Sequence, residues 1–204
     1  MSLSKYKVIF WDFDGVLLDS NSIRDIGFQK VLKDFPKKEV EDLLSFHREN
    51  GGLSRYVKFR HFFENIRREK ISDYDILKLS DSFSIIMREL LLNRELLIQQ
   101  TLDFVKLYYG KIKMYIVSGS DQNELRFLCD ELLLSIYFKG IYGSPTPKNE
   151  LVSNILNHNN FEIGQCILIG DSINDYEAAK HNKIHFLSFN NPSLIYLDDI
   201  NYIF

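Results

Sequence analysis

Two kinds of hydrophobic pattern divide the chain into three parts. Near both ends, short runs of consecutive apolar residues alternate with stretches in which apolar residues recur every three or four positions. The short runs predict buried strands, and the periodic stretches predict helices. We expect strands at 7–12, 112–117, 137–142, 166–170 and 184–188, and helices at 121–133, 147–158 and 174–181. Because strands that alternate with helices form parallel sheets, the pattern predicts a parallel sheet with helices on both faces.

The middle of the chain, 21–108, has no convincing strand pattern. Its apolar residues recur at helical spacing, as Tyr56, Phe59, Phe63 and Ile66 illustrate. This periodicity predicts helices at 21–35, 38–49, 54–68, 73–91 and 95–109. The sequence therefore predicts an all-helical segment that is inserted directly after the first strand.

Two aspartates one residue apart end the first predicted strand. Side chains at positions i and i+2 of a strand point the same way, so Asp12 and Asp14 should crowd one face. Two carboxylates that close repel each other unless a cation lies between them or one is protonated. Asp and Gly are also common turn residues, so a polar turn that includes Gly15 is the alternative interpretation.

Polar or charged side chains follow three other predicted elements. They are Asp171 and Asp175 after 166–170, Ser118 and Gly119 after 112–117, and Lys148 at the start of the helix behind Pro147. The carboxyl ends of parallel strands converge on one crevice, where ligands bind. Carboxylates suit Mg²⁺, whereas an ammonium and free backbone N–H groups suit phosphate. In the alternative interpretation, Ser118 caps the next helix and Lys148 is solvated.

These four segments resemble, in the same order, the four motifs of the haloacid dehalogenase-like (HAD) phosphohydrolase superfamily. The resemblance covers residues 5–20 and about 100–190. It implies an α/β fold, with a Rossmann-like three-layer core and a parallel sheet. It also implies that 1–19 and 92–204 form the catalytic core, while 20–91 form an inserted helical cap of the C1 type. The polar stretch at 18–20 and Asn93 are the expected hinges.

The resemblance also implies a role for each motif residue. Asp12 would be the nucleophile and Asp14 the general acid and base. Mg²⁺ would bind the Asp12 carboxylate, the Asp14 backbone carbonyl and Asp171. Asp175 would either bind the metal, for example through water, or act as a hydrogen-bond acceptor behind it. The phosphoryl group would be held by Ser118, by the Gly119 N–H and by Lys148, which would also pair with Asp12.

The segment Gly51-Gly52-Leu53-Ser54-Arg55 is the most informative part of the predicted cap. It resembles the loop of β-phosphoglucomutase-like members, in which the arginine meets a distal anionic group of the substrate. The alternative is an ordinary arginine at a helix start that Ser54 caps.

Other basic residues lie near this loop. Lys58, one turn from Arg55, would either share its anion or belong to a solvated face with Arg60, Arg67 and Arg68. Arg24 stands where many relatives carry a cap-hinge histidine, which weakens the case for mutase activity.

Composition excludes several classes of function. The chain has 204 residues, 45% of them hydrophobic, and a net charge of −3, which argues against a general nucleic-acid binder. It shows neither a signal segment nor a membrane-spanning run. Cys129 and Cys166 lack metal-ligand spacing and are expected to be buried free thiols of a cytoplasmic protein. The five histidines show no metal-ligand spacing either.

The leading hypothesis is a Mg²⁺-dependent phosphatase that hydrolyses a small phosphorylated metabolite, such as a sugar phosphate, through an aspartyl phosphate. The alternatives are a phosphosugar mutase of the β-phosphoglucomutase type and a non-catalytic binding or regulatory protein. We expect a monomer or weak homodimer that binds neither nucleic acid nor membranes.

Overall fold

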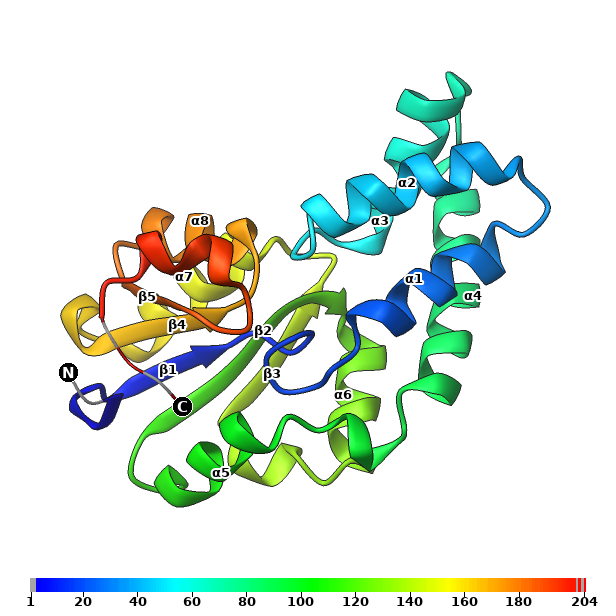
Figure 1. Cartoon of the computed structure of the whole chain (residues 1–204). Helices are drawn as coiled ribbons and strands as arrows, with labels where there is room; N and C mark the ends of the chain where they lie inside the picture. Colours follow the sequence, from blue (N-terminus) through cyan, green and yellow to red (C-terminus); the bar gives the residue numbers. More distant parts are fainter. Residues whose placement is uncertain (1–2, 201, 203) are drawn as a thin grey trace.

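A computed structural model describes residues 3–200, 202 and 204, and it contains a five-stranded parallel sheet (Figure 1). The strands are β1 (Val8–Trp11), β2 (Lys113–Asp121), β3 (Gly140–Ser144), β4 (Cys166–Gly170) and β5 (His185–Ser188), in the spatial order β3-β2-β1-β4-β5. The predicted α/β fold with a parallel sheet is confirmed. The third strand begins later than predicted, because residues Ser135–Tyr137 form a 3₁₀ turn and pairing with β2 starts at Gly140.

The core has three layers because every residue of β1 is buried, with successive side chains on opposite faces. Ile9 and Trp11 belong to one hydrophobic cluster, together with residues of α5 (Gln99–Tyr108) and α6 (Gln122–Glu131). Val8 and Phe10 belong to a second cluster, with residues of α7 (Lys148–Asn159) and α8 (Ile173–His181). The two helix pairs lie on opposite sides of the sheet (Figure 1).

Four further helices form a lobe at one end of the molecule (Figure 1). They are α1 (Asn21–Val31), α2 (Lys37–Glu49), α3 (Arg55–His61) and α4 (Asp73–Leu90). The lobe has its own aromatic centre, where the Phe28 ring lies 5.3 Å from Phe59 and 4.6 Å from Phe83 between centroids. This helical lobe, inserted between β1 and β2, is the predicted cap.

The cap helices depart from the predicted lengths in two places. The first stops at Val31 rather than 35, and Pro36 follows, which disfavours helical conformation in the residue before it. The third continues from α3 into a wider π-helical turn, Phe62–Arg67, which ends at Arg68 with a left-handed φ of 60°. Short 3₁₀ turns complete the chain at Leu3–Lys5, Arg94–Leu96, Ser135–Tyr137, Ile163–Gln165 and Pro192–Leu197.

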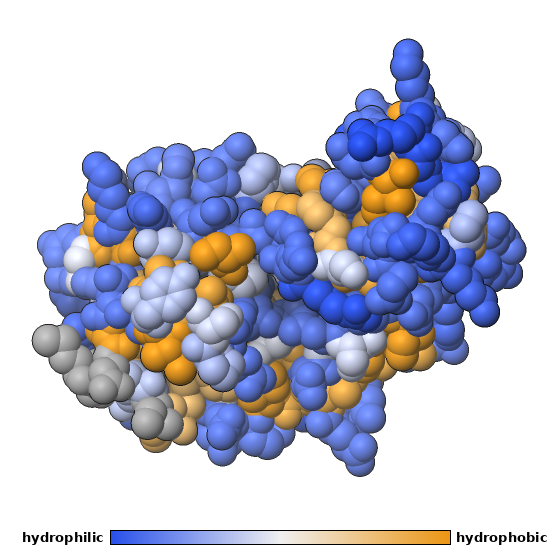
Figure 2. Space-filling view, turned by 45° about the horizontal axis from the view of Figure 1, so that its top comes forward, coloured by the Kyte–Doolittle hydropathy of each residue, from blue (hydrophilic) through white to orange (hydrophobic). Residues whose placement is uncertain are grey.

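The two chain segments that join the cap to the core run side by side. The Asp19 N–H donates to the Leu96 carbonyl at 2.7 Å, and the Ile98 N–H donates to the Leu17 carbonyl at 3.1 Å. These crossings are close to the hinges expected at 18–20 and Asn93. The visible surface of both lobes is largely hydrophilic (Figure 2). Among the described residues, no helix is both long and apolar enough to cross a membrane.

Candidate active site

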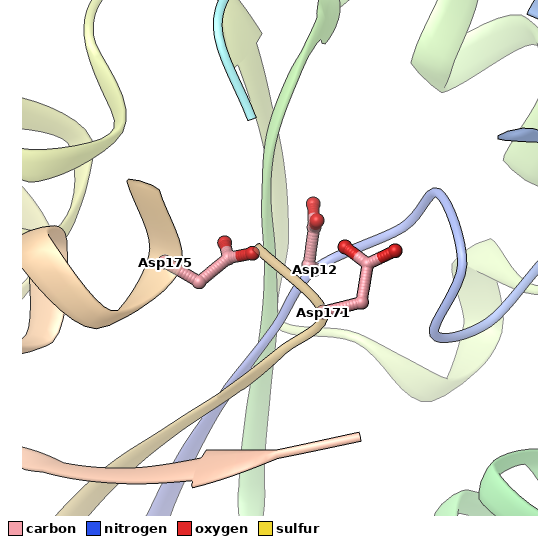
Figure 3. A group of neighbouring side chains, drawn as sticks. All are labelled: Asp12, Asp171 and Asp175. Atoms are coloured by element: carbon pink, nitrogen blue, oxygen red, sulfur yellow. The ribbon is translucent and has the colours of Figure 1, made fainter. Parts of the chain in front are cut away.

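Three aspartates converge at the carboxyl ends of β1 and β4, as Figure 3 shows. One carboxylate oxygen from each of Asp12, Asp171 and Asp175 lies within 4.8 Å of the others. Pairing of β1 with β4 brings the first two together, because the Asp12 N–H donates to the Ile169 carbonyl at 2.9 Å. The sequence expectation that separate strand ends contribute to one acidic cluster therefore matches the geometry.

The three carboxylates repel one another in a poorly solvated space. Burial and the charge of Asp175 raise the pKa of Asp12, although Lys148 acts in the opposite direction. Burial and Asp175 also raise the pKa of Asp171 to about 7. A divalent cation that binds oxygen would relieve this repulsion, so the donor set fits Mg²⁺.

Lys148 supplies the positive charge closest to the cluster. It is the first residue of α7, and its Nζ lies 2.9 Å from Asp12 Oδ1 and also donates to Asp175 Oδ1. The second oxygen of Asp175 accepts bonds from the backbone and hydroxyl of Ser172, at 3.0 and 2.6 Å, as part of the capping box of α8. Asp175 is therefore a hydrogen-bond acceptor that anchors Lys148, and its carboxylate also belongs to the acidic cluster, so both roles predicted for it stay predictions.

Asp14 lies outside the acidic cluster and faces the cap. Its carboxylate accepts bonds from Arg24 Nε at 3.0 Å, Ser120 Oγ at 2.6 Å and Ser20 Oγ. Burial by itself would raise the pKa of Asp14, but the Arg24 charge and these hydrogen bonds outweigh it and lower the pKa to about 2. With Arg24 in place, Asp14 is ionised at neutral pH.

Gly15 allows the loop after β1 to pass close to the carboxylate of Asp171. Gly15 has a φ of 73°, and a side-chain carbon there would overlap the carboxylate of Asp171. Gly15 is therefore required both for its left-handed backbone conformation and for its lack of a side chain. The sequence had suggested only a turn at this position.

The end of β2 contributes Ser118 and Gly119. Ser118 is buried, and its hydroxyl accepts a bond from the Ser120 N–H at 3.1 Å. The cap of α6 is Asp121, whose carboxylate accepts from the N–H groups of Asn123 and Glu124 at 3.0 Å each. The alternative in which Ser118 caps this helix is therefore wrong.

Gly119 lies under a loop of the cap. A side-chain carbon at Gly119 would overlap the carbonyl oxygen of Gly52, and one at Gly52 would press on Ser172 and Asn174. The double glycine therefore lets the cap loop rest directly on two of the core motifs. From the sequence, only the arginine of this loop was considered, and this contact was not predicted.

Arg55 lines the pocket, but it already forms an ion pair with Glu124 of the core. Its Nη1 donates to Glu124 Oε2 at 2.6 Å and to Ser84 Oγ at 2.7 Å, and its guanidinium lies 4.5 Å from the Phe83 ring centroid. Glu124, on α6, also accepts a bond from Arg24. One buried core glutamate therefore joins two arginines of the cap.

Lys58 and His47 complete the cap side of the pocket. Lys58 is only 3% exposed, so the interpretation that it belongs to a solvated face is wrong, whereas Arg60 and Arg68 are at the surface as expected. His47 is also buried. Both residues line one narrow pocket of about 40 Å³ together with Asp12 and Ser118.

Four further residues contact the predicted site residues but were not themselves predicted as site residues. They are Ser20, Arg24, Ser120 and Glu124. A weak signal existed for Arg24, which follows Ser20 by one helical turn at the start of the cap. Glu124 carried no signal, because a charged residue in the first turn of an amphipathic helix is usually solvated.

Comparison with solved structures shows the same fold in known proteins. A haloacid dehalogenase-like family hydrolase from Streptococcus pneumoniae matches with a TM-score of 0.69 and 21% identity, over 96% of this chain and 93% of that one. A CbbY variant from Rhodobacter sphaeroides, in complex with xylulose-(1,5)bisphosphate, has a TM-score of 0.72 and 14% identity over 92% and 89%. The HAD-hydrolase YfnB from Bacillus subtilis, bound to magnesium, has a TM-score of 0.65 and 17% identity over 91% and 87%.

The sequence itself gives a family match that spans both parts of the core and the cap between them. Among curated proteins, no sequence matches this chain significantly. The family model for haloacid dehalogenase-like hydrolases, however, matches residues 8–189, which is most of the chain. The chain therefore belongs to the haloacid dehalogenase-like hydrolase family.

Proposed function

We propose that this protein is a Mg²⁺-dependent phosphatase that hydrolyses a small phosphorylated metabolite through an aspartyl phosphate. The observation that carries the proposal is the placement of Asp12. It lies at a strand end, 2.9 Å from Lys148 and within the acidic cluster, while Asp14 is held apart from that cluster. Two carboxylates in such different surroundings suit two different chemical roles.

In the proposed reaction, a carboxylate oxygen of Asp12 attacks phosphorus and the ester P–O bond breaks. Asp14 donates a proton to the departing alkoxide and later accepts one from the water that attacks the aspartyl phosphate. Lys148 and the Gly119 N–H neutralise charge on the phosphoryl oxygens. Asp12, Asp171 and the Asp14 carbonyl would hold Mg²⁺, which would neutralise negative charge on the phosphoryl group.

The ionised state of Asp14 places a condition on this mechanism. The charge of Arg24 helps to hold the pKa of Asp14 at about 2. Asp14 can therefore carry a proton for the leaving group only after Arg24 has moved away from it. Arg24 belongs to the cap and Asp14 to the core, so a movement of the cap would separate them. The same movement would admit the substrate, since a pocket of about 40 Å³ holds only a few water molecules.

The test is a screen of phosphorylated metabolites with Mg²⁺, in which release of inorganic phosphate is measured. We expect turnover of at least one ester, and we expect Asp12→Asn to abolish it with an unchanged melting curve, because the amide is a poor nucleophile. Substantial activity of Asp12→Asn would contradict the covalent mechanism. Isomerised phosphosugar without phosphate release would instead favour the mutase alternative.

A further inference from the structure

The ammonium group of Lys58 is buried without a carboxylate partner. Its Nζ lies 2.8 Å from His47 Nδ1 and 3.0 Å from the Gly51 carbonyl oxygen, and both partners are neutral acceptors. An ammonium has three donors, so one remains after these two bonds. Within the described part of the chain, no carboxylate forms an ion pair with Lys58.

His47 accepts, rather than donates, in this arrangement. Burial, followed by the charge of Lys58, lowers the pKa of His47 to about 2, so the imidazole is neutral. A neutral ring that accepts at Nδ1 carries its proton on Nε2, which faces Asp25 Oδ1 at 3.7 Å. His47 therefore orients Lys58 without neutralising its charge.

The other cations around the pocket are matched by carboxylates. Arg24 pairs with Asp14 and Glu124, and Arg55 pairs with Glu124. A buried ammonium without an ion-pair contact is costly: burial lowers the pKa of Lys58 to about 7, although the charges of Asp14 and Asp12 act in the opposite direction. Of the described residues that line this pocket, Lys58 is thus the cation that can gain most from an anionic ligand.

Lys58 lines the same pocket as Asp12, the proposed nucleophile, and Ser118, a proposed phosphate-binding residue. We propose that Lys58 binds a second acidic group of the substrate, a carboxylate or a second phosphate, while the phosphoryl group that is hydrolysed lies at Asp12. This inference rests on the proposed phosphatase function. It assigns the distal anion to Lys58 rather than to Arg55, whose charge is matched by Glu124.

A purely structural role for Lys58 leads to a different expectation. Its bond to the Gly51 carbonyl holds the loop that rests on Gly119, so loss of Lys58 could disturb closure of the cap. Loosening of this loop would reduce activity on all esters by the same factor. Loss of an anion-binding group would reduce activity only on esters that carry the second acidic group.

The experiment uses three matched ladders of substrates with Mg²⁺. The first contains alkyl phosphates from ethyl to pentyl, the second their ω-carboxylated counterparts, and the third the corresponding alkanediol bisphosphates. For at least one length, we expect the wild-type protein to prefer a doubly acidic ester over its alkyl counterpart by roughly ten- to a hundredfold in kcat/KM, the range of a charge-assisted contact. The second and third ladders distinguish a carboxylate from a phosphate.

Substitution of the lysine identifies the residue responsible. Lys58→Met should abolish the preference, so kcat/KM should fall roughly ten- to a hundredfold more on the doubly acidic ester than on its alkyl counterpart. Lys78→Met, at an exposed position of the cap, is the control and should keep the preference. Lys58→Gln, which retains hydrogen-bonding groups, should behave like Lys58→Met and serves if the methionine variant does not fold.

Three results would overturn the inference: no preference at any length in the wild type, a preference that survives in both Lys58 variants, or an equal loss on all three ladders. Each of them leaves the phosphatase assignment intact. Failure of the wild-type protein to release phosphate from any ester would instead reject the proposed function itself.

Discussion

The guanidinium of Arg24 donates to both carboxylate oxygens of Asp14, from Nε to Oδ1 at 3.0 Å and from Nη2 to Oδ2 at 3.3 Å. The two residues lie on different sides of the site, since Arg24 belongs to the first cap helix and Asp14 follows the first core strand. Their contact therefore links the position of the cap to the charge of the proposed acid and base.

Replacement of Arg24 by methionine should destabilise the protein in a pH-dependent way. At pH 7, Arg24→Met leaves Asp14 without its cation and weakens the compensation of Glu124, which should cost about 3–5 kcal/mol in free energy of unfolding. Asp14 then loses the interaction that holds its pKa at about 2, so its pKa rises. As pH falls from 7 towards 5, the folded variant takes up a proton that the unfolded chain does not, and the difference from wild type should shrink. Urea unfolding at several pH values measures this, and a pH-independent difference would contradict it.

Replacement of Arg55 should act on stability and on all substrates alike. Arg55→Met removes one of the two cations that compensate buried Glu124, so we expect a loss of stability of about 3 kcal/mol. Because its charge is already matched, kcat/KM for singly and doubly acidic esters should fall by similar factors. Melting curves and the matched substrate ladders provide the measurement. A selective loss on doubly acidic esters would restore Arg55 as the distal anion binder.

Mg²⁺ should stabilise the protein most at high pH. The pKa of Asp171 is raised to about 7, above that of the unfolded chain, so the folded state binds more protons between about pH 4 and 7. Stability of the metal-free protein should therefore fall as pH rises from about 4 to 7, and Mg²⁺ should offset this fall because it neutralises the ionised carboxylate of Asp171. Melting temperatures in chelator and in Mg²⁺ from pH 5 to 8 test this. Asp171→Asn should flatten the pH dependence and remove most of the Mg²⁺ effect.

Ca²⁺ should inhibit the Mg²⁺-supported activity. Mg²⁺ requires near-octahedral geometry, whereas Ca²⁺ accepts more oxygen ligands at longer distances. A second oxygen of Asp12 could then be drawn to the metal, which would spoil its attack on phosphorus. Initial rates with both ions, over a range of their ratio, provide the measurement. Full activity in excess chelator, or equal activity with Ca²⁺ alone, would contradict the proposed metal site.

A methyl group at Gly119 should impair closure of the cap. The added carbon in Gly119→Ala would overlap the Gly52 carbonyl, so the loop at 50–53 has to move away from the end of β2. We expect kcat/KM to fall at least about tenfold, since small misplacements of catalytic groups are costly. Gly164→Ala is the matched control, because a carbon at that exposed position meets no atom within 4 Å. Unchanged activity of Gly119→Ala would show that closure does not need this contact.

Local pattern was enough to predict the architecture of the core and its acidic cluster. Strands β1 and β4 are short apolar runs that end just before an aspartate, and parallel pairing brings these ends to one edge of the sheet. Asp12, Asp171 and Lys148 could thus be placed together before their contacts were known. The wide π-helical turn at Phe62–Arg67 was not predictable, because an apolar spacing of three and four residues also describes an α-helix.

The sequence alone determined the succession of strands and helices along the chain, the helical insertion after the first strand and the chemical groups at the strand ends, because these depend on neighbouring residues. Only the tertiary structure decided which charges compensate one another. Arg55 and Glu124 are 69 residues apart in the chain, and Arg24 and Glu124 are 100 apart, yet both pairs are in contact. Periodicity indicates which face of a helix is buried, but not which charge the opposing element presents. For that reason, the ion pair of Arg55 with Glu124 and the lack of an ion pair at Lys58 become visible only when the cap is folded against the core.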